Sequence, residues 1–293
     1  MYISSNIVNP PETIALALFL VVLLILASAA INDIKTREVH DGHWIAIGLA
    51  GIIAWIAISV YQGIGWEHIA IAAGSGIIIF DVLWDSDRSI ITSALIYGSI
   101  FVLFLLPYML SPSNEMIQAR MMIPVFYVIY MLMYMAGILR GGADAKCMIS
   151  LTVAFPLYIE FWHFPIVAIP DGVISEVFVF SLTVLFYALL FSLSTVIYFI
   201  YRNFRDGNTG RRIVSGYMMD IDDAEDSYVW PMDDVGENGL YNISIPEYTY
   251  EIYERLRESG EKRIWVTPMI PFIFPLFVAF LFTGIVGNIL FLI

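Results

Sequence analysis

Two aspartates stand where long apolar segments of this sequence end or begin. Asp33 closes the first apolar run, and Asp144 follows the pair Gly141-Gly142 just before another run. Two close carboxyls in a poorly solvated site cannot both ionise easily, so one keeps its proton while the other is negative. The ionised carboxyl can accept a proton from water while the protonated one supports a carbonyl oxygen, which is the chemistry of aspartic proteolysis. The pattern makes Asp33 and Asp144 candidate catalytic residues.

Each aspartate also has a simpler interpretation. Aspartate at a helix end is commonly a cap or a solvated interface residue. The helix dipole would favour the ionised form of Asp144 in a first helical turn, which makes it one candidate for the base. The roles stay open between the two carboxyls, and such a pair titrates jointly. Asp81 could lie a turn inside the membrane and belong to the same site.

The elements that must position these residues are membrane helices. The 293 residues are 59% hydrophobic with a mean hydropathy of +0.79, whereas soluble domains are about 45–50% apolar. Roughly 20 apolar residues span a bilayer as a helix. The sequence therefore predicts an all-α polytopic membrane protein with about eight transmembrane helices. The expected spans are 13–32, 43–60, 68–84, 89–110, 121–139, 146–166, 173–201 and 268–293.

A long polar segment separates the last two expected spans. Residues 202–265 contain 14 Asp or Glu and 8 Lys or Arg, a net charge of −6. Leu240–Tyr250 is rich in β-branched and aromatic residues and predicts one or two short strands, and Tyr250–Glu258 predicts a short helix. We expect a small α+β insert before the last helix. The expected organisation is a transmembrane catalytic region with seven helices at 1–201, an acidic soluble insert at 202–267 and a final transmembrane helix at 268–293.

The basic residues predict the orientation in the membrane. If the first span runs from outside to inside, thirteen of the fourteen Lys and Arg fall in or beside inside segments, and only Arg120 falls outside. The positive-inside rule favours that orientation. It places the N-terminus outside and the insert in the cytoplasm. It also brings Asp33 and Asp144, 111 residues apart in sequence, to one cytoplasmic boundary.

Three stretches of the sequence carry a family resemblance. Asp33–Val39 (DIKTREV) has an aspartate at a helix end followed by a basic and an apolar residue. Gly141–Lys146 (GGADAK) has glycines before an aspartate, and Lys262–Phe272 (KRIWVTPMIPF) leads into the last helix after the insert. These stretches resemble the archaeal preflagellin and type IV prepilin peptidases, membrane aspartic proteases of the GxGD group.

The match to this family has departures. Ala143 stands where the GxGD pattern has its second glycine, and His40 stands where many relatives have proline. The aspartates are further apart than the family leads us to expect, so 89–139 or part of it is a candidate insertion. The cysteine-rich cytoplasmic insert of bacterial members has no counterpart here, since Cys147 is the sole cysteine. The bacterial N-methyltransferase activity is therefore not implied.

The resemblance implies an endopeptidase that removes the short basic leader of archaellin or type IV pilin-like precursors at the cytoplasmic face. Such an enzyme needs no cofactor, and its partners are the precursor proteins and the lipid membrane, with no nucleic acid. The acidic insert could attract a basic leader or be a solvated loop kept soluble by charge. The implied site residues are Asp33 and Asp144 as catalytic groups, with Gly141, Gly142, Lys146 and Arg37 shaping the site or binding substrate.

Two further patterns were weighed. His40, Asp41 and His43 resemble metal ligands, but they lie in a short connection with no further ligand nearby, so we expect no metal. A transporter or channel is the alternative function, because intramembrane carboxylates often mark ion paths. Such a path needs polar groups through the whole depth, whereas the two aspartates share one face. A third function class, a membrane-embedded scaffold subunit, does not explain why two aspartates would lie at the same boundary.

Overall fold

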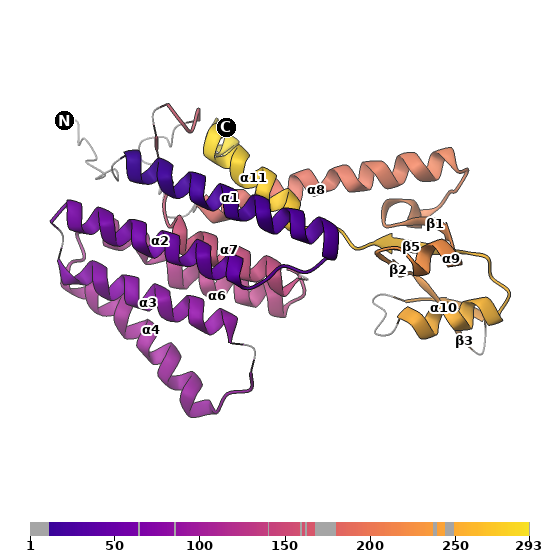
Figure 1. Ribbon diagram of the computed structural model, residues 1–293, viewed down its shortest axis with the longest axis horizontal. Helices are drawn as coiled ribbons and strands as arrows, with labels where there is room; N and C mark the ends of the chain where they lie inside the picture. Colours follow the sequence, from indigo (N-terminus) through magenta and orange to yellow (C-terminus); the bar gives the residue numbers. More distant parts are fainter. Residues whose placement is uncertain are drawn as a thin grey trace. The chain divides into compact units, whose positions relative to one another are not determined.

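The computed structural model describes residues 12–63, 65–84, 86–139, 141–158, 160–161, 163–167, 180–236, 239–243 and 249–292. The chain divides into two compact units, one formed by residues 1–189 with 272–293 and the other by residues 190–271. The first unit is helical and the second mixes helices with short strands (Figure 1).

The first unit is built from apolar helices, and their bounds follow the apolar runs of the sequence. They are α1 (Glu12–Thr36), α2 (Gly42–Tyr61), α3 (Trp66–Leu83), α4 (Ile90–Leu110), α5 (Glu115–Arg120), α6 (Met122–Met135), α7 (Gly142–Ala154) and α11 (Ile273–Val286), followed by the 3-10 turn Ile289–Leu292. Helix α8 (Phe180–Arg205) begins in this unit and continues into the second.

Among the described residues, six helical segments are long and apolar enough to cross a membrane, α5 and α6 together forming one of them. The others are α1, α2, α3, α4 and α8. The chain is thus a multi-pass membrane protein with a small α/β region before its last helix, as the sequence predicts. The expected count of eight spans is not confirmed, because α7 has 13 residues and α11 has 14.

Prolines and a glycine explain why these two helices are short. Helix α7 ends at Ala154, and Phe155 has φ −127° and ψ 71°, since a residue before proline, here Pro156, avoids the helical region. Helix α11 starts at Ile273, after Pro268 and Pro271. It stops at Gly287, whose φ of 87° suits glycine. Residues 168–179, where the expected span 173–201 begins, lie outside the described residues.

Two glycines allow helices of the first unit to approach closely. Helix α2 packs beside α7, and α1 packs beside α11 (Figure 1). A Cβ atom on Gly51 of α2 would lie 2.4 Å from the Ala154 Cα of α7, and one on Gly284 of α11 would lie 2.2 Å from the Phe19 ring of α1. Small residues at such positions are the usual basis of tight helix packing in membranes.

The second unit contains a three-stranded antiparallel sheet with the order β1-β5-β2, in which Tyr217 pairs with Val266. A separate hairpin joins β3 to β4. A buried core, which includes Tyr253 and Leu256, packs between the sheet and the helices. The elements are a 3-10 turn (Arg211–Val214), β1 (Tyr217–Asp220), α9 (Ile221–Glu225), β2 (Val229–Pro231), β3 (Asp233–Gly236), β4 (Gly239–Asn242), α10 (Thr249–Glu258) and β5 (Arg263–Pro268).

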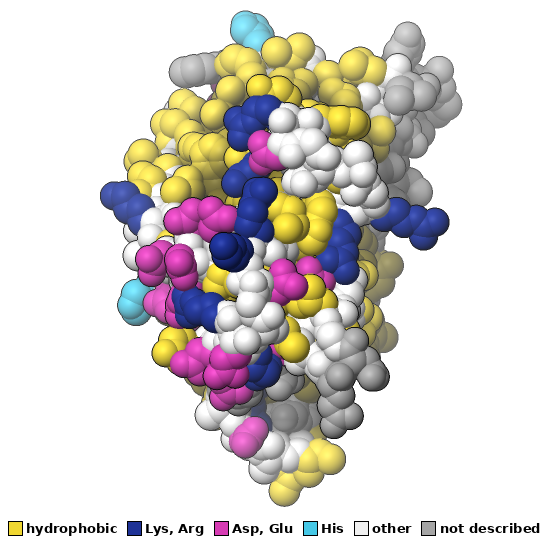
Figure 2. All heavy atoms as spheres, turned by 90° about the vertical axis from the view of Figure 1, so that its right-hand side faces the viewer, with side chains coloured by type: hydrophobic (Ala, Val, Ile, Leu, Met, Phe, Trp, Pro, Cys, Tyr) yellow, Lys and Arg dark blue, Asp and Glu magenta, His cyan; other side chains and the backbone are white. Residues whose placement is uncertain are grey.

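Many acidic side chains of the second unit are engaged by arginines. Arg255 binds Asp234 at 2.7 Å, and this hydrogen bond lowers the pKa of Asp234. Arg212 binds Asp233 at the same distance. Figure 2 shows basic and acidic side chains interspersed over the face that it presents. These ion pairs engage part of the acidic charge, while residues 202–265 as a whole carry a net charge of −6.

Candidate active site

Asp33 lies in the last turn of α1, and its side chain turns toward the start of α11. Its carboxyl accepts a hydrogen bond from the backbone N–H of Ile273, at 3.0 Å. The side chain is buried, with 8% of the residue exposed. Phe272 precedes α11 and offers no side-chain cap, so Asp33 satisfies one of the N–H groups left free at this helix start. The first apolar helix and the last are thereby joined through a candidate catalytic residue.

Asp144 lies in the first turn of α7, outside the six candidate spans. Its Oδ2 atom accepts a hydrogen bond from the backbone N–H of Gly141, at 3.2 Å. Burial and, to a smaller extent, the negative charge of Asp33 raise the pKa of Asp144, the Gly141 hydrogen bond lowers it, and the net result is a pKa of about 7. The two carboxyls predicted from sequence therefore lie close enough for one charge to oppose ionisation of the other.

The two glycines before Asp144 have different functions. A Cβ atom on Gly141 would lie 2.6 Å from the Asp144 Oδ2 atom, so a side chain there would collide with the carboxyl. A Cβ atom on Gly142 would meet only the Tyr134 hydroxyl, at 3.7 Å, which is an ordinary contact. Gly141 is thus the position that the carboxyl geometry requires, a distinction that the paired glycines alone do not reveal.

The connection between α1 and α2 is held at both ends. Arg37 has φ 59°, a left-handed conformation, and its N–H binds the Asp33 carbonyl at 3.2 Å as α1 ends. The Lys146 ammonium binds both carboxylate oxygens of Asp41 at 3.0 Å. His43 contacts the His40 carbonyl at 3.0 Å. These contacts place Arg37 beside Asp33 and join Lys146 to Asp41. From sequence, Asp41 was considered only as a possible metal ligand.

Asp81 is engaged elsewhere. Its carboxylate contacts Arg88 and the Tyr127 hydroxyl, and Arg88 also donates to the Asp81 carbonyl, at 2.9 Å. Arg88 stacks over the Trp84 ring at 5.2 Å. The possibility that Asp81 belongs to the same site as Asp33 and Asp144 thus has an alternative with direct contacts, in which Asp81 and Arg88 close the end of α3.

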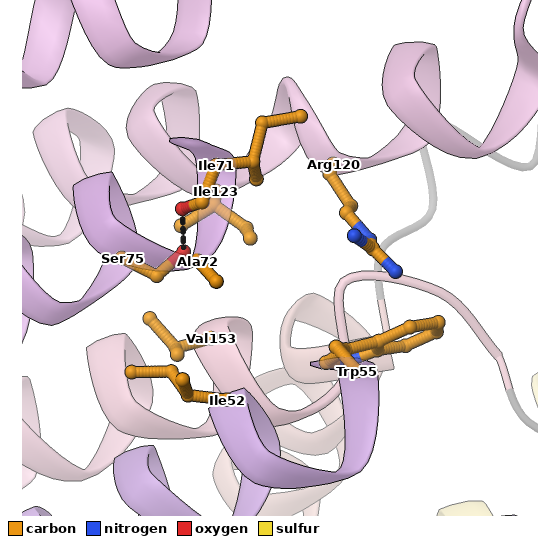
Figure 3. A pocket seen from close by; sticks show the side chains of 8 residues that line it. All are labelled: Ile52, Trp55, Ile71, Ala72, Ser75, Arg120, Ile123 and Val153. Atoms are coloured by element: carbon orange, nitrogen blue, oxygen red, sulfur yellow. Dashed lines mark hydrogen bonds between the residues drawn. The ribbon is translucent and has the colours of Figure 1, made fainter. Parts of the chain in front are cut away.

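A second buried polar cluster lies at the other ends of α2 and α7. Arg120 is 2% exposed, stacks on the Trp55 ring at 4.6 Å and contacts Nδ1 of His68 at 3.0 Å. The Trp55 indole N–H donates to the Ala154 carbonyl at the end of α7. A small cavity adjoins Arg120 (Figure 3). Its lining is mostly apolar and consists of Ile52, Trp55, Ile71, Ala72, Ser75, Arg120, Ile123 and Val153.

Several hydroxyl groups inside the first unit bond within their own helices. Ser59 donates to the Trp55 carbonyl, Ser75 to the Ile71 carbonyl and Thr283 to the Ala279 carbonyl. Such hydroxyls are satisfied locally. Others bond between helices, since the Ser181 hydroxyl of α8 contacts those of Tyr130 in α6 and Thr152 in α7, at 3.0 and 2.8 Å.

Comparison with known proteins covers both units. The C-terminal part, residues 211–289, matches the family model "Archaeal Peptidase A24 C-terminus Type II". The preflagellin peptidase of Methanocaldococcus jannaschii is 22% identical over 273 residues, covering 92% of this chain and 94% of that protein. The preflagellin peptidase of Methanococcus maripaludis is 23% identical over 271 residues, covering 90% of this chain and 92% of that protein.

The chain is similar to the archaeal preflagellin peptidases. The likeness to preflagellin peptidases extends over nearly the whole chain, so it includes the segments that carry Asp33 and Asp144 as well as the insert. These relatives indicate peptide-bond hydrolysis as the class of reaction. The expected resemblance is confirmed.

Two features of the candidate site were missed by the sequence analysis. The bond from Ile273 to Asp33 joins residues 240 positions apart, and no local pattern announces it. Asp41 did carry a signal, since it immediately precedes α2 and lies in the short connection after Asp33. That signal was interpreted only as a possible part of a metal cluster.

Proposed function

We propose that the chain is a membrane aspartic endopeptidase that uses Asp33, Asp144 and a water molecule. The observation that carries the proposal is the interaction between these two carboxyls, contributed by the end of α1 and the start of α7. Like charges placed together in a poorly solvated site share protons unequally, which is the condition that aspartic proteolysis requires.

The geometry favours a division of labour. Asp33 accepts an N–H from the first residue of α11, and the N-terminus of a helix stabilises negative charge. The raised pKa of Asp144, about 7, keeps it protonated below neutral pH and leaves a large protonated fraction at neutral pH. Asp33 is then the base and Asp144 the acid. This reverses the suggestion from the dipole of α7, because burial and the charge of Asp33 outweigh that dipole.

The reaction proceeds in two steps. Asp33 takes a proton from water as the water oxygen bonds to the peptide carbonyl carbon, and Asp144 gives its proton to the carbonyl oxygen. In the second step Asp144 takes a proton back from one hydroxyl of the tetrahedral intermediate, and Asp33 gives its proton to the amide nitrogen. The C–N bond breaks and releases an acid and an amine, with both carboxyls returned to their starting states.

The proposed substrates are archaellin or type IV pilin-like precursors, whose short basic leader is removed at the cytoplasmic face. The name "preflagellin peptidase" of both relatives supports this class of substrate. The distribution of basic residues supports an outside N-terminus, with the site and the insert of 202–267 in the cytoplasm. An apolar precursor helix would lie beside the transmembrane region of 1–201 and the last helix of 268–293.

Cleavage of a tagged precursor in membranes tests the function. The wild-type chain should remove the leader, whereas Asp33→Asn and Asp144→Asn should each lower the rate by about 10³-fold or more, since each removes a group that moves a proton. Asp87→Asn is the matched control, because Asp87 is exposed in the connection after α3. It should cut like the wild type.

Membrane insertion must be measured for all four proteins, by extraction and by protease protection of a tag. Normal cleavage by Asp33→Asn or by Asp144→Asn would refute the proposal that these two aspartates form the catalytic pair. A wild-type chain that inserts but cuts neither archaellin nor pilin precursors would refute the substrate class.

A further inference from the structure

An ion pair connects the two segments that carry the aspartates. The Lys146 ammonium lies 3.0 Å from both Asp41 oxygens. Lys146 is two residues after Asp144 in α7, and Asp41 is eight residues after Asp33, immediately before α2. The side chains are 16% and 40% exposed respectively. The pair therefore ties the start of α7 to the connection that follows α1.

The connection between Asp33 and Asp41 can transmit a constraint because hydrogen bonds hold it along its length. The Thr36 hydroxyl contacts the carbonyls of Asn32 at 2.9 Å and Glu38 at 3.1 Å. His43 binds the His40 carbonyl with one ring nitrogen and approaches the Ser28 hydroxyl of α1 with the other, at 3.3 Å. These hydrogen bonds make the connection stiff, so we expect a change in the position of Asp41 to move the last turn of α1 as well.

The expected contribution of this pair to stability is small. Partly exposed ion pairs typically contribute about 0.2–1 kcal/mol to stability. Catalysis is more sensitive, since a misplacement of about 1 Å can cost on the order of 10²-fold in rate. A contact of this kind can therefore matter more for the relative placement of two carboxyls than for folding.

We propose that Asp41 and Lys146 are positioning residues that hold Asp33 and Asp144 in register for catalysis. The inference rests on the proposed function. Lys146 acts through its carboxylate partner and not by changing the charge of Asp144 directly. In keeping with this, the charge that acts most on Asp144 is that of Asp33, while the Lys146 ammonium faces Asp41.

The test is a double-mutant cycle on precursor cleavage. Asp41→Ala and Lys146→Ala should each lower kcat by about 10- to 100-fold while KM stays within about twofold. The double variant should be no slower than the slower single variant, because the first substitution already removes the shared contact. The pair Asp41→Asn with Lys146→Gln should recover part of the rate, since two amides can still hydrogen-bond.

Asp220→Ala is the matched control. Asp220 forms an exposed ion pair with Arg263 at 3.4 Å in the second unit, so this variant removes a comparable pair far from the site in sequence. It should leave kcat unchanged. The melting temperature in detergent should stay close to that of the wild type in every variant.

Two readouts separate positioning from other roles. In both single variants kcat should be lower at every pH, with the pH of half-maximal activity unchanged. If that pH shifts in Lys146→Ala, the Lys146 charge acts directly on the catalytic carboxyls and the proposal is overturned. Hydrogen exchange does not require activity, and Lys146→Ala should increase exchange in 36–43 while 86–89 stays unchanged. Unchanged exchange would overturn the proposal even if the wild type cuts no precursor.

The proposed function and the positioning role can fail separately. Single variants that cut at the wild-type rate, beside inactive Asp33→Asn and Asp144→Asn, would refute the positioning role and leave the dyad. Multiplicative losses in the double variant would show that Asp41 and Lys146 act independently.

Discussion

The two ends of the α2–α7 pair bury opposite charges in different ways. At one end Asp33 and Asp144 bring two like groups together. At the other end, Arg120 packs against Trp55 and His68. Asp41 and Trp55 mark these ends on α2 and are 14 residues apart, or roughly 21 Å along a helix. One pair of helices thus positions both clusters.

The difference lies in what surrounds each charge. The described contacts of Arg120 are an imidazole nitrogen, an indole face and the Met116 sulfur at 3.2 Å, with no carboxylate among them. The carboxyls instead oppose each other, and Asp144 remains partly exposed. Proton exchange with water is therefore available at the acidic end. Burial alone therefore does not make a site reactive, because proton transfer also needs groups with unequal proton affinities and access to water.

The largest expected effect comes from removing both carboxyls. If Asp33 and Asp144 act as one unit, the variant Asp33→Asn/Asp144→Asn should be as inactive as either single variant, about 10³-fold or more below the wild type. Single-turnover cleavage of a precursor measures this. If the rate losses of the two single variants multiply in the double variant, the two aspartates contribute independently and do not act as one unit.

The second effect is a pH dependence of stability. Asp144 has a pKa raised from 3.8 to about 7 in the folded protein, so between these values the folded state holds a proton that the unfolded state has released. Stability falls as pH rises through that window, by at most about 1.4 kcal/mol per pH unit. Asp144→Asn stays neutral at every pH. Its melting temperature relative to the wild type should therefore rise from pH 4 to 7 and level off above.

Thermal melts in detergent at several pH values would check this trend. The Asp220→Asn variant provides the baseline for removing an exposed carboxyl. A difference between Asp144→Asn and the wild type that does not change with pH would mean that Asp144 is not held protonated.

The smallest effect is expected at the Arg120 end. Arg120→Met keeps most of the side-chain volume without the charge, and replacing buried charged groups with apolar ones is often neutral or stabilising. Cleavage should stay within about twofold of the wild type. Arg120→Glu would bury a carboxylate near Trp55 and should destabilise the protein by about 3–5 kcal/mol. Loss of cleavage in folded Arg120→Met would extend the functional site to both ends of the helices.

The sequence predicts the long apolar helices of this fold, because hydropathy alone identifies them. The expected spans 13–32, 43–60 and 89–110 correspond to α1, α2 and α4, because long apolar runs have little alternative in a membrane. It also predicts that Asp33 and Asp144 meet, since charge distribution and helix order place them at one boundary. Helix lengths were less predictable, as an apolar run continues past Pro156 although α7 ends at Ala154.

Pairings between distant segments were not predictable from local pattern. Tyr217 and Val266 are paired in the sheet at a separation of 49 residues, and Lys262–Phe272 was interpreted only as the approach to the last helix, although β5 occupies much of it. Almost every residue type has a backbone N–H, so the identity of residue 273 does not indicate that its N–H binds Asp33. The pairing of Lys146 with Asp41 was equally hidden, because each residue has several plausible partners.

The bond between Asp33 and Ile273 has a consequence for biosynthesis. A ribosome delivers α1 long before α11, and chains are made from the N-terminus at about 5–20 residues per second. Asp33 therefore waits for roughly 240 residues, on the order of tens of seconds at that pace, before its backbone donor exists. A nascent chain that ends before α11 contains both aspartates but lacks the backbone donor for Asp33. We therefore expect it to be inactive until α11 has been synthesised.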